Sequence, residues 1–215
     1  MRQTQMTIAD LVMAWGRGWA VSRGTHAPTS IEGGFRIDVG LPGHRVRHIL
    51  HTVQPNALRQ LAHSLTDPGS WIKVFSVDPE LIACFDQRWK RDVPGYLMSV
   101  SLIESEVSLP AGYSVEVDTD HGATVARVRA ADASEAASGR MGPAGEFAVF
   151  DQIKTDPGHR RRGLGRVVMR VLGNHAIEKG AHTGILGATE EGLALYQAIG
   201  WTVHTEFVGF SLPEE

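Results

Sequence analysis

The N-terminal half of the chain mixes a helical hydrophobic period with strand-like runs. Residues 7–21 predict a helix with Thr7 as its cap, because one face collects the apolar side chains Ile8, Leu11, Val12, Trp15 and Trp19. Residues 24–34 contain glycine, proline, threonine and serine, as linkers do. Beyond them we expect strands at 34–39, 46–53, 71–77 and 96–102, and helices at 55–64 and 79–87. We assign residues 1–107 to an N-terminal accessory region.

The C-terminal half predicts a more regular α/β pattern. Strands are expected at 113–118, 124–130, 134–141, 145–155 and 183–187, and helices at 165–179 and 190–199. Two short strands, 201–207 and 208–212, are expected to close the sheet. The fold class is therefore α/β (α+β), with a mixed central sheet flanked by helices. We place the catalytic domain at residues 108–215.

The stretch from Phe147 to Gly165 joins a strand, a loop and the start of a helix. Phe147–Ile153 is apolar and β-prone, and the turn Asp156-Pro157-Gly158 follows it. Behind the loop, one helix face is formed by Leu164, Val168, Val171, Leu172 and His175. The sequence therefore predicts a basic loop that leads directly into a helix N-terminus.

A phosphate group fits such a helix start. The first backbone N–H groups of a helix have no intrahelical acceptor, and the helix dipole adds partial positive charge there. Gly163 and Gly165 allow close approach to the backbone, and fixed positive charge comes from Arg160, Arg161, Arg162 and Arg166. An exposed basic helix start without a ligand is the alternative reading. A P-loop is excluded because no Lys-Ser or Lys-Thr follows the glycines, and a Rossmann fingerprint is excluded because position 168 is Val.

The same stretch resembles the acyl-CoA-binding motif of the GCN5-related N-acetyltransferases (GNAT). Its signature [QR]-x-x-G-x-[GA] is matched by Arg160-Arg161-Arg162-Gly163-Leu164-Gly165. Thr155-Asp156-Pro157 is similar to the family's strand exit, and Leu195–Trp201 is similar to its LYEKLGF segment. Motif order and spacing both match over residues 112–210. A degenerate GNAT-like half is one reading of residues 1–107.

The resemblance implies acetyl-CoA as co-substrate and assigns residues to its binding. The pyrophosphate would bind the loop residues Arg160, Arg161, Arg162, Gly163, Leu164, Gly165 and Arg166. The pantetheine arm would pair with the backbone of Ile153 and Thr155, where a β-bulge must part the central strand from its neighbour. Thr189 stands where the family often has Asn, so it is either a CoA contact or only a helix N-cap.

The resemblance also suggests two catalytic side chains. Tyr196 matches the tyrosine that protonates the departing thiolate, although a packed helix aromatic is the alternative. Asp151 is the candidate base for the ammonium, because strand alternation puts it on one face with Ile153 and Thr155, provided that the bulge does not shift the alternation. A structural Asp bonded to backbone or to an Arg is equally open, and a water chain is the alternative carrier of the proton.

Composition narrows the function classes. The 215 residues carry 21 Lys and Arg against 24 Asp and Glu, a net charge of −3, which argues against nucleic acid as a partner. The single cysteine, Cys84, excludes an internal disulfide, and no CxxC or HExxH motif supports a metal. Without a membrane-length apolar run or a signal-peptide pattern, we expect a cytoplasmic protein with no membrane partner.

The leading hypothesis is an N-acetyltransferase acting on a primary amine of a small molecule or peptide. The alternative is a non-catalytic acyl-CoA-binding sensor. The identity of the acceptor amine and the possibility of a homodimer stay open at this stage, because fold does not fix function.

Overall fold

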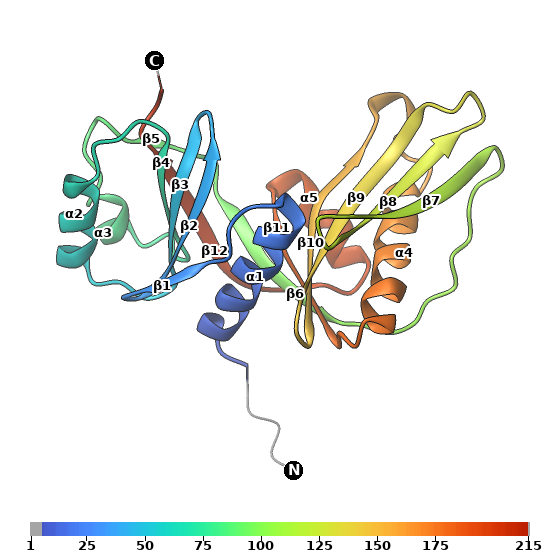
Figure 1. Ribbon diagram of the computed structural model, residues 1–215, viewed down its shortest axis with the longest axis horizontal. Helices are drawn as coiled ribbons and strands as arrows, with labels where there is room; N and C mark the ends of the chain where they lie inside the picture. The colour runs from blue at the N-terminus through green and yellow to red at the C-terminus, as the bar shows by residue number, and fades with distance from the viewer. Residues whose placement is uncertain (1–5, 215) are drawn as a thin grey trace, which may run out of the picture. The chain divides into compact units, whose positions relative to one another are not determined.

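The computed structural model describes residues 6–214 and shows a mixed α/β fold (Figure 1). Its residues group into two compact units. Of the described residues, unit 1 contains 6–16, Thr25–Met98 and 187–214, whereas unit 2 contains Arg17–Gly24 and Ser99–Leu186. The grouping differs from the single boundary expected near residue 107, because the C-terminal helix and strand join the N-terminal segments. The accessory and catalytic roles of the two halves remain predictions.

Unit 1 contains a mixed sheet. The strand order is β1-β2-β3-β4-β12, with β3 and β4 parallel and the other pairs antiparallel. The short β5 also pairs with β12. The bounds of these strands are Thr29–Ile31 (β1), Gly34–Leu41 (β2), His44–Leu50 (β3), Ser70–Val74 (β4), Lys90–Arg91 (β5) and Thr202–Ser211 (β12).

Helix α2 (Pro55–Ser64) connects the parallel strands β3 and β4 of unit 1. Pro55 favours the start of this helix, because the first helical position lacks an intrahelical acceptor for its N–H anyway. The buried cluster beneath α2 comprises Leu50, Leu58, Ala62, Ile72, Val74, Cys84, Trp89, Val208, Phe210 and Leu212. The bounds predicted for α2 are confirmed, and Cys84 is a buried core residue.

Three expectations for unit 1 were wrong. The segment 24–34 contains strand β1 in addition to turns. The helix expected at 79–87 is only α3, Pro79–Ile82, which Asp78 caps by accepting a hydrogen bond from the Glu80 N–H. The two strands expected after residue 200 are one continuous strand, β12. The segment from Thr202 to Val208 contains no glycine or proline. It therefore has no residue that would interrupt the strand before Gly209.

The strands of unit 2 have the order β11-β10-β9-β8-β7. Strands β10 and β11 are parallel and the other pairs are antiparallel. Their bounds are Tyr113–Asp120 (β7), Ala123–Ala130 (β8), Glu135–Ala144 (β9), Phe147–Thr155 (β10) and Thr183–Ala188 (β11), the last two residues of β11 belonging to unit 1. Strand β6 (Gly95–Ser101) likewise begins in unit 1 and ends in unit 2.

Helix α4 (Leu164–Glu178) is the crossover between β10 and β11 and packs on β8, β9 and β10 (Figure 1). Its buried face includes Leu164, Val168, Val171 and Leu172, as the periodicity predicts. His175 extends the stripe in sequence but is only half-buried, and it bonds Glu178. A parallel strand pair needs such a crossover, since a tight turn cannot join parallel ends.

The end of helix α1 (Ile8–Arg23) covers the other face of the unit 2 sheet. A Cβ on Gly18 would clash with Val149, and one on Gly142 would clash with the carbonyl of Gly18. These glycines therefore permit close backbone contact between helix and sheet. Thr7 caps the helix as predicted, because its Oγ1 accepts a hydrogen bond from the Asp10 N–H at 3.1 Å. No helix among residues 6–214 is long and apolar enough to span a membrane.

Candidate functional site

One edge of strand β10 is open along its C-terminal half. β10 pairs with β11 only from Phe147 to Val149, whereas it pairs with β9 as far as Thr155. The Asp156 N–H donates to Ala136 on the β9 side. Because backbone N–H groups alternate in direction along a strand, the N–H of Thr155 points to the open edge. In the described chain, that edge has no partner strand after Val149.

The expected β-bulge is present in β10. The register with β9 shifts between Asp151 and Lys154, so that one extra residue is placed on β10. Gln152 lies within the shift and has a φ of 53°, in the left-handed region. A bulge bends its strand and reverses the side-chain alternation beyond it.

This reversal corrects one expectation about Asp151. Asp151 bonds Ser22 and Arg23 at the end of α1, on the face that Val149 also occupies. Ile153 instead points to the α4 face, where its Cδ1, together with Val168, occupies the space that a Cβ on Gly139 would take. Asp151 and Ile153 thus do not share a face, because the bulge lies between them.

Asp151 is held by three hydrogen bonds. Its Oδ2 accepts from Arg23 Nε at 2.5 Å and from Ser22 Oγ at 2.9 Å, and its Oδ1 accepts from Arg23 Nη2 at 3.0 Å. The Asp151 side chain is only 15% exposed. This two-pronged contact with an arginine is the arrangement of a structural ion pair.

The loop after β10 presents backbone donors. Asp156 starts a 3-10 turn, Pro157–His159, by accepting a hydrogen bond from the Gly158 N–H at 2.8 Å. Arg161 and Gly163 have φ values of 64° and 78°, both left-handed. Among the described residues, no acceptor bonds the backbone N–H groups from Arg161 to Arg166. The loop therefore ends at the α4 N-terminus with a row of N–H groups free to bind an anion.

The loop is accessible at Gly163 and at its four arginines. A Cβ on Gly163 would meet no atom within 4 Å, so space remains over the backbone. The side chains of Arg160, Arg161, Arg162 and Arg166 are exposed. Leu164 is instead buried beneath α4, and Gly165 is half-buried in its first turn. The loop thus combines an open backbone with four cations, which fits a diphosphate.

One of these arginines is positioned by a tyrosine that the sequence did not single out. Tyr113 Oη accepts a hydrogen bond from Arg162 Nη1 at 2.8 Å and bonds His159 Nδ1 at 2.9 Å. Tyr113 begins β7, 49 residues before Arg162. No local pattern links the two positions, which is why sequence reasoning missed the contact.

The remaining site residues belong to unit 1. Helix α5 (Glu190–Ala198) is capped by Thr189, whose hydroxyl accepts from the Gly192 N–H at 3.3 Å. The N-cap reading of Thr189 is thereby confirmed, whereas a contact with CoA stays a prediction. Tyr196 is buried, 9% exposed, with its ring 6.0 Å from that of Trp201. No group of three or more His, Cys, Asp or Glu that could hold a metal lies within residues 6–214.

Solved structures share this fold. A GCN5-related N-acetyltransferase from Kribbella flavida matches with a TM-score of 0.68 and 14% identity, covering 98% of this chain and 97% of that one. A tandem GNAT protein from the clavulanic acid biosynthesis pathway matches with a TM-score of 0.53 and 14% identity, covering 75% and 69%. A GCN5-related N-acetyltransferase-like protein from Streptococcus suis matches with a TM-score of 0.53 and 8% identity, covering 77% and 79%.

The sequence itself matches no family model and no curated protein. The structural matches, at identities of 14% and below, nevertheless establish the fold. The chain has the mixed α/β fold of the GCN5-related N-acetyltransferases, as the motif around Gly163 predicts.

Proposed function

We propose that the protein is an acetyl-CoA-dependent N-acetyltransferase that acts on a primary amine of a small molecule or peptide. The observation that carries the proposal is the open edge of β10, which leads into a loop of unpartnered backbone donors. An extended pantetheine arm can add to such an edge as a strand does, through the backbone at Ile153 and Thr155. The diphosphate of CoA suits the loop from Arg160 to Arg166.

The reaction needs one proton donor and one proton acceptor. The amine nitrogen attacks the thioester carbonyl carbon, so that a C–N bond forms and the C–S bond breaks. The thiolate of CoA leaves, and Tyr196 is the proposed donor of its proton. The ammonium proton of the acceptor passes to a base before the attack. The nitrogen loses a second proton as the amide forms, which restores the proton that Tyr196 gave. Thr189 is the proposed further contact with CoA.

Water is favoured over Asp151 as the carrier of the ammonium proton. The Asp151 oxygens already accept from Arg23 and Ser22. To take a proton, a carboxylate oxygen would have to exchange one of these charge-assisted hydrogen bonds for a bond to the proton. A chain of water along the open edge of β10 faces no such cost.

A titration with acetyl-CoA followed by a thiol-release assay tests the proposal. The wild-type protein and Tyr196→Phe are both assayed on a panel of primary amines. We expect equal acetyl-CoA affinity for the two proteins and a turnover that falls about 10²- to 10⁴-fold in the variant, the usual contribution of a general acid. If CoA affinity falls with turnover, Tyr196 is structural. Binding without turnover on any amine would favour the acyl-CoA sensor, and absence of binding would refute the proposal.

A further inference from the structure

A polar pocket of about 370 Å³ lies over the bulge of β10, within unit 2. Three adjacent strands form its floor, with lining residues Val125 and Arg127 of β8, Glu135, Ser138, Gly139 and Arg140 of β9, and Gln152, Ile153 and Lys154 of β10. The last three residues also belong to the stretch of β10 whose other edge is open. The pocket therefore borders the strand segment along which the pantetheine arm is proposed to lie.

The pocket is lined by more positive than negative side chains, namely Arg127, Arg140 and Lys154 against Glu135. Arg140 is neutralised by Asp120, since its Nη2 donates to Asp120 Oδ2 at 2.8 Å. Hydrogen bonds from Arg140 first, and from His121 second, hold the pKa of Asp120 below its ordinary value. Arg140 also donates to the carbonyl of Ser22 at 2.6 Å. Its guanidinium is thus already engaged.

Lys154 and Glu135 form a second pair at 3.4 Å. Burial alone would raise the pKa of Glu135, but hydrogen bonds from Ser138 and Lys154 outweigh it and leave the pKa lowered. Glu135 therefore serves as the counter-ion of Lys154.

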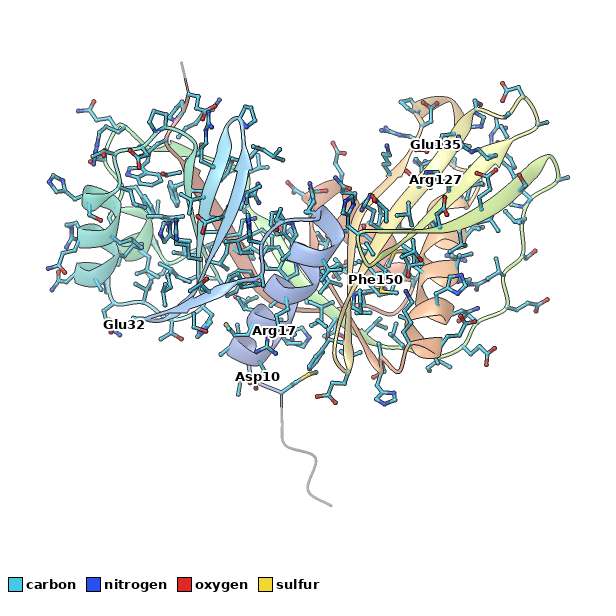
Figure 2. All side chains as sticks on the ribbon, viewed as in Figure 1. Asp10, Arg17, Glu32, Arg127, Glu135 and Phe150 are labelled. Atoms are coloured by element: carbon cyan, nitrogen blue, oxygen red, sulfur yellow. The ribbon has the colours of Figure 1, made fainter. Side chains whose placement is uncertain are left out.

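Arg127 remains without a full partner. Its nearest carboxylates, Glu135 and Asp118, lie at 3.7 and 3.8 Å, beyond hydrogen-bond distance, and the Asp118 side chain is 79% exposed. The Arg127 guanidinium donates no hydrogen bond to any described residue, although its side chain is only 30% exposed. Figure 2 shows Arg127 and Glu135 on neighbouring strands of the same sheet. A half-buried guanidinium with unused donors favours a planar anion that it can bind in bidentate fashion.

We infer that the acceptor is a primary amine that also carries a carboxylate, and that Arg127 binds this carboxylate. The inference rests on the proposed function and adds the class of acceptor to it. One uncompensated cation in the pocket matches a monoanion such as a carboxylate. A phosphate would bring a second negative charge close to Glu135 and is disfavoured for that reason.

Matched acceptor pairs test the inference. The probes are the standard amino acids and their carboxamides, which have the same amine and differ in the negative charge. We expect the wild-type protein to acetylate at least one free acid with a KM about 10- to 100-fold below that of its amide, the range for a hydrogen-bonded charge pair. In Arg127→Gln the KM of the acid should rise to that of the amide, while kcat and the KM of the amide change little.

Arg129→Gln is the matched control. Arg129 lies on the same strand with a side chain 32% exposed, but it bonds Glu116 and does not line the pocket. We expect Arg129→Gln to keep the preference for the free acid. Equal effects of the two variants, or equal KM values for acid and amide in the wild-type protein, would overturn the inference.

A direct acetyl-CoA titration separates the two proposals. If acetyl-CoA binds and amines without a carboxylate are acetylated while no amino acid is, the acceptor inference fails and the proposed function stands. If phosphorylated amines are preferred over carboxylated ones, the inference also fails. If acetyl-CoA does not bind, both proposals fail.

Discussion

Asp151 and Ile153 point to opposite faces of β10, although they are two residues apart. Asp151 bonds Ser22 and Arg23 on the α1 face, whereas Ile153 packs beside Gly139 on the α4 face. In a regular strand, residues i and i+2 share a face. The bulge at Gln152 removes this relationship, because it adds one residue to β10 between its pairs with β9 at Asp151 and Lys154. One local irregularity thus decides which side chains flank the open edge of β10.

The packing of Ile153 against Gly139 gives a stability prediction. A Cβ at position 139 would clash with Ile153 Cδ1 and lie 2.7 Å from Val168 Cγ1. We expect Gly139→Ala to lower the free energy of unfolding by about 1–3 kcal/mol, the range for an overpacked core. Urea unfolding measures this change.

The Ile153→Val background should relieve part of that cost, because valine lacks the clashing Cδ1. A double-mutant cycle should therefore give a coupling of about 0.5 kcal/mol or more. Gly173→Ala in α4 is the control, because its Cβ would meet only Leu102 at 4.0 Å. Strict additivity of Gly139→Ala and Ile153→Val would contradict the placement of Ile153 on the α4 face.

Much of the fold follows from the sequence, because its signals are local. The stripe of α4, the proline at the start of α2 and the motif around Gly163 each occupy a few consecutive residues. The hydrophobic periodicity of a single helix or strand does not indicate which segments of the chain pack into the same core. The grouping of the C-terminal residues from Gly187 with the N-terminal segments therefore had no local signal.

For the candidate site as well, the sequence predicts the features that have a local signal and misses contacts between residues far apart in the chain. The resemblance predicts the bulge, and the short motif predicts a basic loop that leads into a helix start. Phosphate binding by this loop stays a prediction. The sequence did not predict the hydrogen-bond partners of Asp151, because Arg23 lies 128 residues away in sequence. Arg127 and Glu135 also escaped notice, since charged residues on strands normally face solvent and only the pocket distinguishes them.

The contacts of Asp151 predict a structural effect of its replacement. Asp151→Asn removes the charge that Arg23 pairs with, so we expect the free energy of unfolding to fall by about 1.5–3 kcal/mol. Arg23→Gln should have a similar effect, and the double variant should cost less than the sum of the two. Chemical denaturation at neutral pH provides the measurement.

Enzyme kinetics separates this structural role from a catalytic one. If water carries the ammonium proton, Asp151→Asn keeps the acid limb of the pH–rate profile. Loss of that limb in a variant of unchanged stability would instead identify Asp151 as the general base.

His48 gives unit 1 a dependence on pH. Burial is the main cause that lowers the pKa of His48, and its Nδ1 has no hydrogen-bond partner. The folded-state pKa then lies below that of the unfolded chain, about 6.5. As the pH falls through about 6.5, His48 takes up a proton in the unfolded chain but stays neutral in the folded protein. The free energy of unfolding therefore decreases toward acid pH. The loss has a limiting slope of about 1.4 kcal/mol per pH unit.

Replacement of His48 should remove this dependence. We expect the stability of His48→Leu relative to the wild-type protein to increase as the pH falls from about 7 to about 5. Thermal unfolding across this range measures the difference. His63→Leu, at an exposed position of α2, is the control and should follow the wild-type curve. Parallel curves for wild type and His48→Leu would show that His48 is not responsible.

Gly163 offers a test of the phosphate loop that separates binding from stability. Its φ of 78° is one that only glycine adopts without strain, and the space above it is open. A tryptophan there would fill the space over the unpartnered N–H groups, so we expect Gly163→Trp to weaken acetyl-CoA binding by about 100-fold or more, or 2.7 kcal/mol.

Gly145→Trp, in the turn between β9 and β10, is the matched control. Gly145 has a φ of 70° and equally open surroundings, so the backbone strain is comparable. Calorimetry on both variants should show similar losses of thermal stability but a loss of affinity only for Gly163→Trp, and unchanged affinity in that variant would rule out this loop as the phosphate site.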